Sequence, residues 1–234
     1  MTLKTLAAAA LAIPLALGAA HAADPADSLL TPDNHTLLLI DHQPQMAFAT
    51  KSIDVAELRN NTVGLAKSAA LFEVPTILTT VAADSFSGAI FPEIQAVFPD
   101  QTPIDRTTMN TWEDDNVVNV IKENGRKKVV MAGLWTEVCI VLPALSAIEE
   151  GYDVYVVTDA SGGVTDEAHD MAVQRMVAAG ATPITWVQYL LELQRDWARG
   201  ETYAGTMDIA KEHAGGYGLG VIYAEQMFNA REGQ

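Results

Sequence analysis

Residues 127–159, KKVVMAGLWTEVCIVLPALSAIEEGYDVYVVTD, predict a strand, a tight turn, a helix and a second strand in that order. The first strand is the apolar, β-branched run 128–132, which charged residues precede and Gly133 follows. A run that is apolar at successive positions is typical of a parallel strand buried on both faces of a sheet. This stretch therefore indicates an α/β fold with a central parallel strand.

The helix of this stretch begins at residue 137, because apolar residues recur from there at intervals of three and four. Thr136 is its expected N-cap and Gly151 its expected end. The second strand follows at 154–157. The apolar positions of the helix are Val138, Val141, Leu142, Leu145 and Ile148.

Cys139, the only cysteine of the chain, lies in the first turn of this helix, just after the carboxyl end of a parallel strand. Unpaired backbone N–H groups and the positive end of the helix dipole favour a thiolate there. Ligands of open α/β sheets also gather at this edge. The alternative is a small buried hydrophobic residue, which is the commoner environment of a lone cysteine. The sequence pattern leaves the two interpretations about even.

The run AGLWTEVC, followed by PALSAIEEGYDVYVVTDASG, resembles the nucleophile segment of the isochorismatase-like cysteine hydrolases, most of all their metal-free YcaC-like branch. The resemblance covers roughly residues 37–197. That family uses a cysteine nucleophile, an aspartate at the end of the first strand, and a basic residue, usually lysine, upstream of the nucleophile. The resemblance therefore implies that Cys139, Asp41 and Arg106 are catalytic.

Asp41 follows the apolar run 36–40, TLLLI, and is expected at the carboxyl tip of a buried first strand. The resemblance makes it the general base, in a D-x-Q pattern that Gln43 completes. A carboxylate beside a thiol accepts its proton and later passes it to a leaving group. Local sequence is equally compatible with an aspartate that caps a turn. The adjacent His42 is expected to point away from Asp41, as a pocket residue.

Arg106 is expected at the end of the third strand, within TPIDRTTMN, where most of the family has lysine and the YcaC-like branch has arginine. A guanidinium stays charged and does not shuttle protons, but it holds a carboxylate ionised by bidentate contact. The expected role of Arg106 is therefore electrostatic. The alternative is a solvated surface arginine beside Asp105. Asn110 and Trp112 resemble the N-x-W of the same branch and are expected to line the pocket.

The resemblance also implies a cis peptide bond between Leu134 and Trp135, four residues before the nucleophile. The backbone N–H groups of Trp135 and Cys139 then form the expected oxyanion hole. Trp135 is bulky where relatives often have alanine or valine, so its ring is expected to close part of the pocket. The predicted substrate-binding residues are His42, Asn110, Trp112 and Thr136.

No catalytic metal and no other cofactor is expected. Metal-dependent nicotinamidases carry an acidic and histidine cluster beyond the second strand, but here 82–88 has no histidine, and Asp84 alone does not form a zinc or iron site. This absence argues against nicotinamide as the substrate. Gly162 and Gly163 follow a strand without a GxGxxG pattern, so no nucleotide site is expected.

The alternation of strands and helices predicts a three-layer α/β/α domain over 35–200, with a doubly wound, mostly parallel six-stranded sheet. The other expected strands are 76–81, one that ends at Arg106, and 182–187. The other expected helices are 53–72, 91–98, 113–124, 166–179 and 190–197.

Residues 1–22 predict a secretory signal peptide, with Lys4 as the positive start, an apolar run at 6–17, and Ala20-His21-Ala22 as the cleavage site. The apolar run is too short to span a membrane. The mature protein is therefore expected in the periplasm or outside the cell, with 23–34 as a polar linker. The alternative is an N-terminal hydrophobic helix that stays attached.

The formal charge of the 234 residues is −16, or about −17 without Lys4. So acidic a surface repels phosphate backbones and anionic lipid, and no Lys/Arg cluster interrupts it. Nucleic acid and membranes are therefore not expected partners. A single cysteine excludes an intramolecular disulfide, and an odd thiol in an exported protein indicates either a reactive group or intermolecular pairing.

Residues 201–234 form a tail of different character, with GGYGLGVIYAEQMF first Gly-rich and then apolar. The tail lies beyond the sixth strand, where the core is expected to be complete, so we expect it to dock on a neighbouring subunit. A frayed end is about equally compatible with the pattern. The resemblance favours docking, because YcaC-like proteins are large homo-oligomers.

The sequence thus predicts an exported cysteine hydrolase that acts on a small neutral or cationic molecule. The bond that it is expected to cleave is an amide or related C–N bond. The resemblance also admits chemistry without covalent attack, since isochorismatases cleave a vinyl ether without needing the cysteine. The alternative of another class is a non-catalytic oligomeric binding protein on the same fold, with its pocket obstructed by Trp135. The substrate stays open, because family members with similar triads act on different molecules.

Overall fold

A single six-stranded sheet forms the centre of the computed structural model, which describes residues 24–233. Its strands are β1 (His35–Ile40), β2 (Thr76–Val81), β3 (Ile104–Arg106), β4 (Lys128–Gly133), β5 (Asp153–Val157) and β6 (Thr182–Ile184). The order is β3-β2-β1-β4-β5-β6, and every neighbouring pair is parallel. The predicted doubly wound sheet is therefore confirmed.

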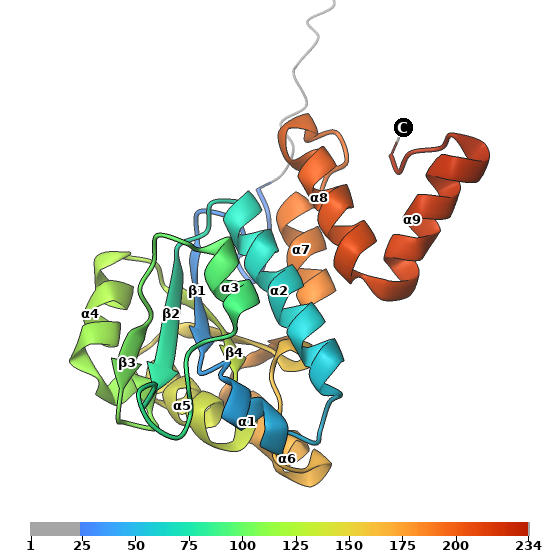
Figure 1. Cartoon of the computed structure of the whole chain (residues 1–234). Coiled ribbons are helices and arrows are strands. Elements are labelled where there is room, and N and C mark those ends of the chain that lie inside the picture. Colours follow the sequence, from blue (N-terminus) through green and yellow to red (C-terminus); the bar gives the residue numbers. More distant parts are fainter. Residues whose placement is uncertain (1–23, 234) are drawn as a thin grey trace, which may run out of the picture.

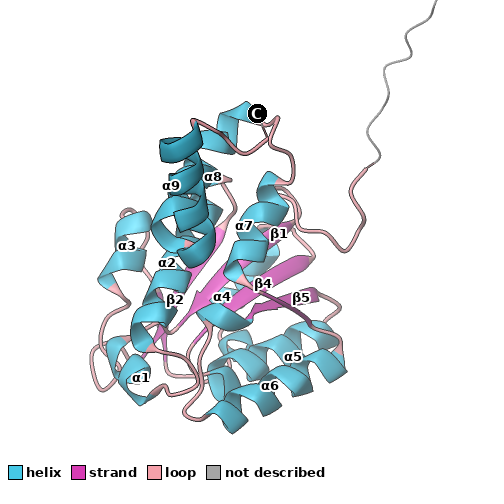
Figure 2. Cartoon of the chain, turned by 90° about the vertical axis from the view of Figure 1, so that its right-hand side faces the viewer, coloured by secondary structure: helices cyan, strands magenta, loops and turns pink. Residues whose placement is uncertain are grey.

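Helices cover both faces of this sheet (Figures 1 and 2). They are α1 (Pro44–Ala49), α2 (Val55–Leu71), α3 (Pro92–Val97), α4 (Asp115–Glu123), α5 (Val141–Glu149), α6 (Asp166–Ala179), α7 (Trp186–Gln194), α8 (Gly200–His213) and α9 (Gly215–Phe228). One apolar cluster joins the sheet to α1, α2, α3, α7 and α8, and a second joins it to α4, α5 and α6. The arrangement is the predicted three-layer α/β/α fold.

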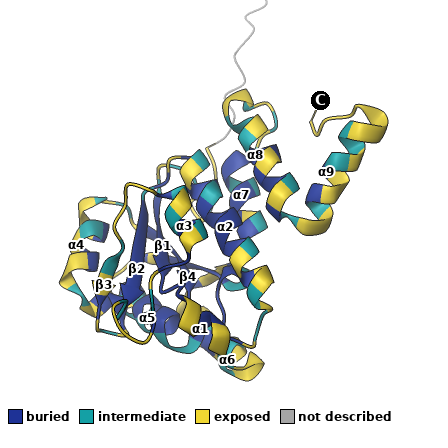
Figure 3. Ribbon diagram, in the orientation of Figure 1, coloured by how far each residue is buried: buried dark blue, intermediate teal, exposed yellow. Residues whose placement is uncertain are grey.

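The central strands are buried because both of their faces are covered. All six residues of β1, of β2 and of β4 are buried, and Figure 3 shows these strands in dark blue between helices that expose their outer surfaces. This burial explains why the strands are apolar at successive positions instead of alternating with polar residues.

Two predictions around β6 are wrong. The strand ends at Ile184 instead of residue 187, and the following helix begins at Trp186 instead of residue 190. Thr185 sets this boundary, because its hydroxyl accepts a hydrogen bond from the N–H of Gln188 at 3.4 Å and caps α7. The helix predicted at 166–179 coincides with α6, whereas the short helix α1 has no counterpart among the predicted elements.

The turn that carries Cys139 also differs from its prediction. Residues Thr136–Ile140 form one π-helical turn, and the regular helix α5 begins only at Val141. Thr136 is not the N-cap: no side chain caps this turn, and the Thr136 hydroxyl lies 2.8 Å from Nδ1 of His169. Single π-helical turns are frequent at functional sites.

The segment predicted as a tail is helical, and its first half belongs to the same core. α8 packs on α2 and α7, with Met207, Ile209 and Ala210 buried. The expectation that the core is complete after β6 is therefore wrong for α8. α9 packs on α8 and extends away from the sheet (Figure 1).

The chain before β1 is attached to the domain where it is described. Leu30 is fully buried, and its N–H donates to Oε1 of Glu192 in α7 at 2.6 Å. Nζ of Lys128 donates to the carbonyl of Leu29 at 2.8 Å. The predicted signal peptide at 1–22 lies outside the described residues. Within residues 24–233, no helix is both long and apolar enough to cross a membrane.

Candidate active site

The three predicted catalytic residues lie at the carboxyl edge of the sheet. Asp41 follows the last residue of β1, Arg106 is the last residue of β3, and Cys139 lies in the turn after β4. All three are buried, with exposed fractions of 0% for Asp41, 3% for Arg106 and 2% for Cys139. Charges interact more strongly here than in water, because the surroundings have a low dielectric constant.

Asp41 and Arg106 form a buried ion pair. Nη2 of Arg106 lies 2.6 Å from Oδ2 of Asp41. Thr79, near the end of β2, donates its hydroxyl to Oδ1 of Asp41 at 3.2 Å. Arg106 also donates from Nη1 to the carbonyl of Thr108. These contacts exclude the alternative of a solvated surface arginine, and they show that the Asp41 carboxylate serves this pair instead of capping a turn.

Two backbone features bring the ends of β1 and β4 together. Asp41 has a φ of 56°, a conformation that residues other than glycine rarely adopt, and it turns the chain sharply after β1. Gly133, at the end of β4, lies directly against the end of β1, because a Cβ atom at this position would overlap the carbonyl oxygen of Ile40. The N–H of Leu134 donates to that carbonyl at 3.1 Å. A side chain at position 133 would therefore separate the two strand ends.

The thiol of Cys139 lies close enough to Asp41 and to the predicted oxyanion hole to be affected by both. The Asp41 carboxylate raises the pKa of this thiol, and the backbone N–H of Trp135 lowers it. The peptide bond between Leu134 and Trp135 is cis, as the resemblance implies. Nε1 of the Trp135 indole donates to the carbonyl of Met46 at 2.9 Å, which ties the ring to α1.

The resting sulfur is a neutral thiol. Burial, and after it the charge of Asp41, raise the pKa of Cys139 to about 12. The charge of Arg106 and the N–H of Trp135 lower this pKa without offsetting those effects. The expectation of a resting thiolate at the helix start is therefore wrong, because desolvation outweighs the helix dipole. Cys139 consequently needs a base before it can attack.

Asp41 is the predicted base, and its carboxylate is buried beside Arg106. Burial raises the pKa of Asp41 above its ordinary value, whereas Arg106, Cys139 and Thr79 act in the opposite direction. A raised pKa makes the carboxylate a stronger acceptor for the thiol proton, while the guanidinium favours the ionised form before the reaction. The Cys139 thiol and the Asp41 carboxylate thus share one proton, which can pass from the sulfur to the carboxylate oxygen.

His42 lies next to Asp41 in the chain, but its contacts are structural. It is fully buried, its Nε2 donates to the carbonyl of Ala160 at 2.9 Å, and its ring centroid lies 6.0 Å from that of Phe91. Burial lowers the pKa of His42 to about 4, so the ring is neutral at pH 7. A substrate-binding role for His42 stays a prediction.

The other predicted substrate-binding residues contact neighbours outside the triad of Asp41, Arg106 and Cys139. Asn110 accepts a hydrogen bond from the N–H of Trp112 at 3.0 Å and donates to the hydroxyl of Ser146 in α5 at 3.1 Å. The Trp112 ring packs edge-on against Tyr152, with 5.2 Å between centroids. Among residues 24–233, no side-chain hydrogen bond joins Asn110, Trp112 or Thr136 to the triad. Their binding role stays a prediction.

Two further residues support the base. Thr79 holds Oδ1 of Asp41, and Gln43 joins the turn after β1 to the end of β2. Oε1 of Gln43 accepts from the N–H of Val81 at 2.9 Å, and Nε2 donates to the carbonyl of Val81 at 3.2 Å. Sequence reasoning missed Thr79 and treated Gln43 only as part of a pattern. The signal for Thr79 is a polar residue that interrupts the apolar strand 76–81 near its carboxyl end.

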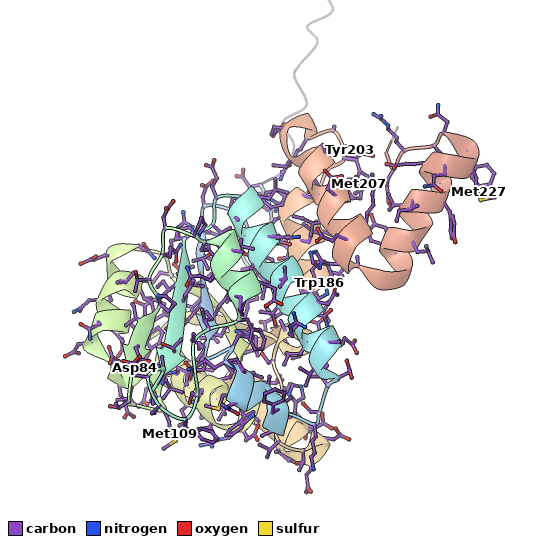
Figure 4. The ribbon with its side chains drawn as sticks, viewed as in Figure 1. Asp84, Met109, Trp186, Tyr203, Met207 and Met227 are labelled. Carbon is purple, nitrogen blue, oxygen red and sulfur yellow. The ribbon has the colours of Figure 1, made fainter. Side chains whose placement is uncertain are left out.

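The described residues 24–233 contain no cluster of metal-binding side chains. No set of three or more His, Cys, Asp or Glu side chains in that range is arranged to hold a metal ion. Asp84, the acidic residue of the loop after β2, is exposed and lies at the carboxyl edge of the sheet, as does Met109 (Figure 4). The expected lack of a metal and of other cofactors stays a prediction.

Comparison with known proteins matches most of the domain to one protein family. A family model described as the isochorismatase domain matches residues 35–188. The probable hydrolase YcaC of Escherichia coli is 41% identical over 169 residues, which cover 72% of this chain and 81% of that protein.

Two solved structures share the fold and about a third of the residues. YcaC from Pseudomonas aeruginosa, described with hexane-2,5-diol and covalent acrylamide, aligns with a TM-score of 0.81 and 36% identity. The ycaC gene product of Escherichia coli, described as an octameric hydrolase of unknown specificity, aligns with a TM-score of 0.82 and 37% identity. Each alignment covers 88% of this chain and 100% of the other, so the likeness extends beyond 35–188.

Proposed function

The chain belongs to the isochorismatase family, and we propose that it is a cysteine hydrolase acting on a small molecule at an amide or related C–N bond. The observation that carries this proposal is the buried ion pair of Asp41 and Arg106, whose two charges both act on the pKa of the buried Cys139 thiol. A thiol paired with a base and a neighbouring cation is the arrangement that nucleophilic catalysis requires.

In the proposed reaction, Asp41 accepts the thiol proton while the sulfur of Cys139 forms a bond to the carbonyl carbon. The π electrons of the carbonyl move to its oxygen, which the N–H groups of Trp135 and Cys139 stabilise. Asp41 then donates the proton to the nitrogen, the C–N bond breaks, and an amine and a thioester remain. Water attacks the thioester with Asp41 as base, the C–S bond breaks, and the proton returns to the sulfur as the acid leaves.

Arg106 acts on the charges of this reaction and not on its protons. Its guanidinium is paired with Asp41, so it opposes protonation of the carboxylate before attack. Because Asp41 already compensates this cation, Arg106 supplies no free positive charge for an anionic substrate. Together with the formal charge of −16, this favours a neutral or cationic substrate.

The relatives support a reactive site of this kind. The Pseudomonas aeruginosa YcaC structure is described as containing covalent acrylamide, and acrylamide is a small amide that thiolates attack. We therefore expect acrylamide to label Cys139, at one adduct per chain by mass spectrometry. Cys139→Ser should give no adduct, and an adduct that persists in this variant contradicts a reactive Cys139.

The test of the reaction is a screen of small amides and ureas for ammonia release. Wild type and Val138→Ala should turn over at least one compound, whereas Cys139→Ser should fall to the background rate while keeping a native circular-dichroism spectrum. Val138 is the matched control, because it lies in the same turn and is half-buried. Retained turnover in Cys139→Ser contradicts covalent catalysis and favours chemistry that does not use the cysteine.

A second candidate function is a non-catalytic oligomeric binding protein on the same fold. Two observations favour it: the triad is buried, and burial raises the pKa of the Cys139 thiol to about 12. Labelling with iodoacetamide or acrylamide across pH separates the two candidates. A thiol that stays unlabelled in the folded protein at pH 9, and no ammonia from any compound, support the binding protein.

The proposal extends to assembly and export. The Escherichia coli relative is described as octameric, which supports a homo-oligomer of this chain. Residues 1–22 have the charge, apolar run and small-residue site of a secretory leader, which supports export to the periplasm or beyond. Mass spectrometry of the protein from the producing cell should find Ala23 as the first residue, and an intact Met1 contradicts this.

A further inference from the structure

α9 presents an apolar face that stays exposed in the described chain. The exposed side chains of Leu219, Tyr223 and Met227 are spaced four residues apart, so they form one stripe along the helix. Figure 4 shows Met227 on the outer side of α9, away from the body of the protein. Gly218 and Val221 are the buried residues of α9, on the side that faces α8.

The glycines of α9 face other parts of the same chain. A Cβ atom at Gly218 would overlap the carbonyl oxygen of Ala210 in α8, so this glycine is required by the chain's own packing. Gly216 and Gly220 have no atom within 4 Å of such a Cβ position. These two glycines line a cavity whose opposite wall is residues 230–232, so the C-terminal segment of the same chain lies on their side of the helix.

The charge of α9 identifies the kind of surface. Glu225 is its only charged residue, and it is paired with Lys211 of α8 at 2.9 Å. The helix has no lysine or arginine that would attach it to anionic lipid or nucleic acid. Two copies of a chain with charge −16 repel each other except where the contacting surfaces are uncharged. The stripe on α9 is such a surface.

We propose that α9 pairs with α9 of a second copy of this chain about a two-fold axis. The stripe is symmetric about Tyr223, with Leu219 and Met227 one turn away on either side. In an antiparallel pair Tyr223 therefore meets the partner's Tyr223, and Leu219 meets the partner's Met227. The pairing rests on the proposed homo-oligomer and is independent of the proposed reaction.

The first test measures the mass in solution of the full mature chain by size-exclusion chromatography with light scattering. Wild type should be an oligomer, and Tyr223→Lys should lower its mass by about twofold or more, because like charges then face each other at the axis. Met171→Lys is the matched control, since Met171 is an equally exposed apolar residue on α6. Its mass, and the circular-dichroism spectra of both variants, should match wild type.

The second test fixes the geometry by disulfide formation. In a Cys139→Ser background, which has no other thiol, Tyr223→Cys should give a covalent dimer on mild oxidation. Leu219→Cys should do so only when combined with Met227→Cys. A monomeric wild type overturns both the homo-oligomer and the pairing, and an oligomer that Tyr223→Lys leaves intact overturns the pairing alone. Ammonia release tests the hydrolase separately from both outcomes.

Discussion

Nη2 of Arg106 lies 2.6 Å from Oδ2 of Asp41, and neither side chain is exposed to water. Each charge is tolerable in the interior only because the other is present, since burial of an unpaired ion is very costly. The same two charges also act on the thiol, because Asp41 raises and Arg106 lowers the pKa of Cys139. The ion pair therefore affects both the stability of the fold and the protonation of the Cys139 thiol.

Arg106→Leu is expected to destabilise the fold by about 3–5 kcal/mol at pH 7, because it leaves the Asp41 carboxylate buried without its cation. The loss relative to wild type should be smaller at pH 4. Burial raises the pKa of Asp41, so without Arg106 the folded protein holds a neutral carboxyl group, and its stability falls as the pH rises through that raised pKa. Urea unfolding at both pH values measures this.

Arg106→Lys is the control for this prediction, because it keeps a cation near Asp41 and should lose less stability than Arg106→Leu. Equal losses for Arg106→Leu at pH 4 and pH 7 would show that the charge of Asp41 is not what destabilises the variant.

Asp41→Asn is expected to lower the pKa of Cys139, because the charge of Asp41 raises it. The rate of alkylation by iodoacetamide against pH measures the change. The wild-type rate should climb to the highest accessible pH, since the pKa of Cys139 is about 12, whereas the variant should reach its plateau earlier. Ammonia release should be lost, because the base is absent.

An Asp41→Asn curve that coincides with that of wild type contradicts the effect of the Asp41 carboxylate on the thiol.

The buried histidines should make the fold sensitive to acid. Burial lowers the pKa of His35 and of His42 from 6.5 to about 4. The unfolded chain therefore binds more protons than the folded one between these values, and stability falls as the pH drops from 6.5 towards 4. Each histidine accounts for about 3 kcal/mol of this loss. Urea unfolding between pH 4.5 and pH 7 should show the slope.

His42→Asn should make this slope shallower, while His169→Asn, which changes a half-buried histidine, should have the smaller effect. A slope that does not respond to His42→Asn assigns the acid sensitivity to other groups.

Gly133→Ala is expected to lower both stability and turnover. The added Cβ would overlap the carbonyl oxygen of Ile40 and push apart the strand ends that carry Asp41 and lead to Cys139. The expected cost is about 1–3 kcal/mol, as for other overpacked sites. Thermal unfolding and ammonia release measure the two effects. Gly200→Ala, at a position in α8 with open space, should be neutral or slightly stabilising, and a Gly133→Ala variant as stable and active as wild type contradicts the close approach.

Much of the site could be predicted because its residues follow strand ends that the sequence marks clearly. Asp41 follows the apolar run 36–40, and Cys139 lies at the strand-to-helix turn that the run 128–132 defines, whereas Arg106 within TPIDRTTMN was identified through the family resemblance. The family resemblance then supplied the chemical roles. The boundary at Thr185 was not predictable in the same way, since the apolar residues Trp186 and Val187 fit a buried strand as well as a buried helix.

By itself, the sequence determined the α/β class, the order of the elements and the places where polar side chains end the buried strands, because these depend on local periodicity and composition. Only the tertiary structure decided that Cys139 rests as a thiol, that Arg106 is fully paired with Asp41, and that α8 completes the core while α9 does not. These properties depend on burial and on distances between residues far apart in the chain, which no local pattern contains.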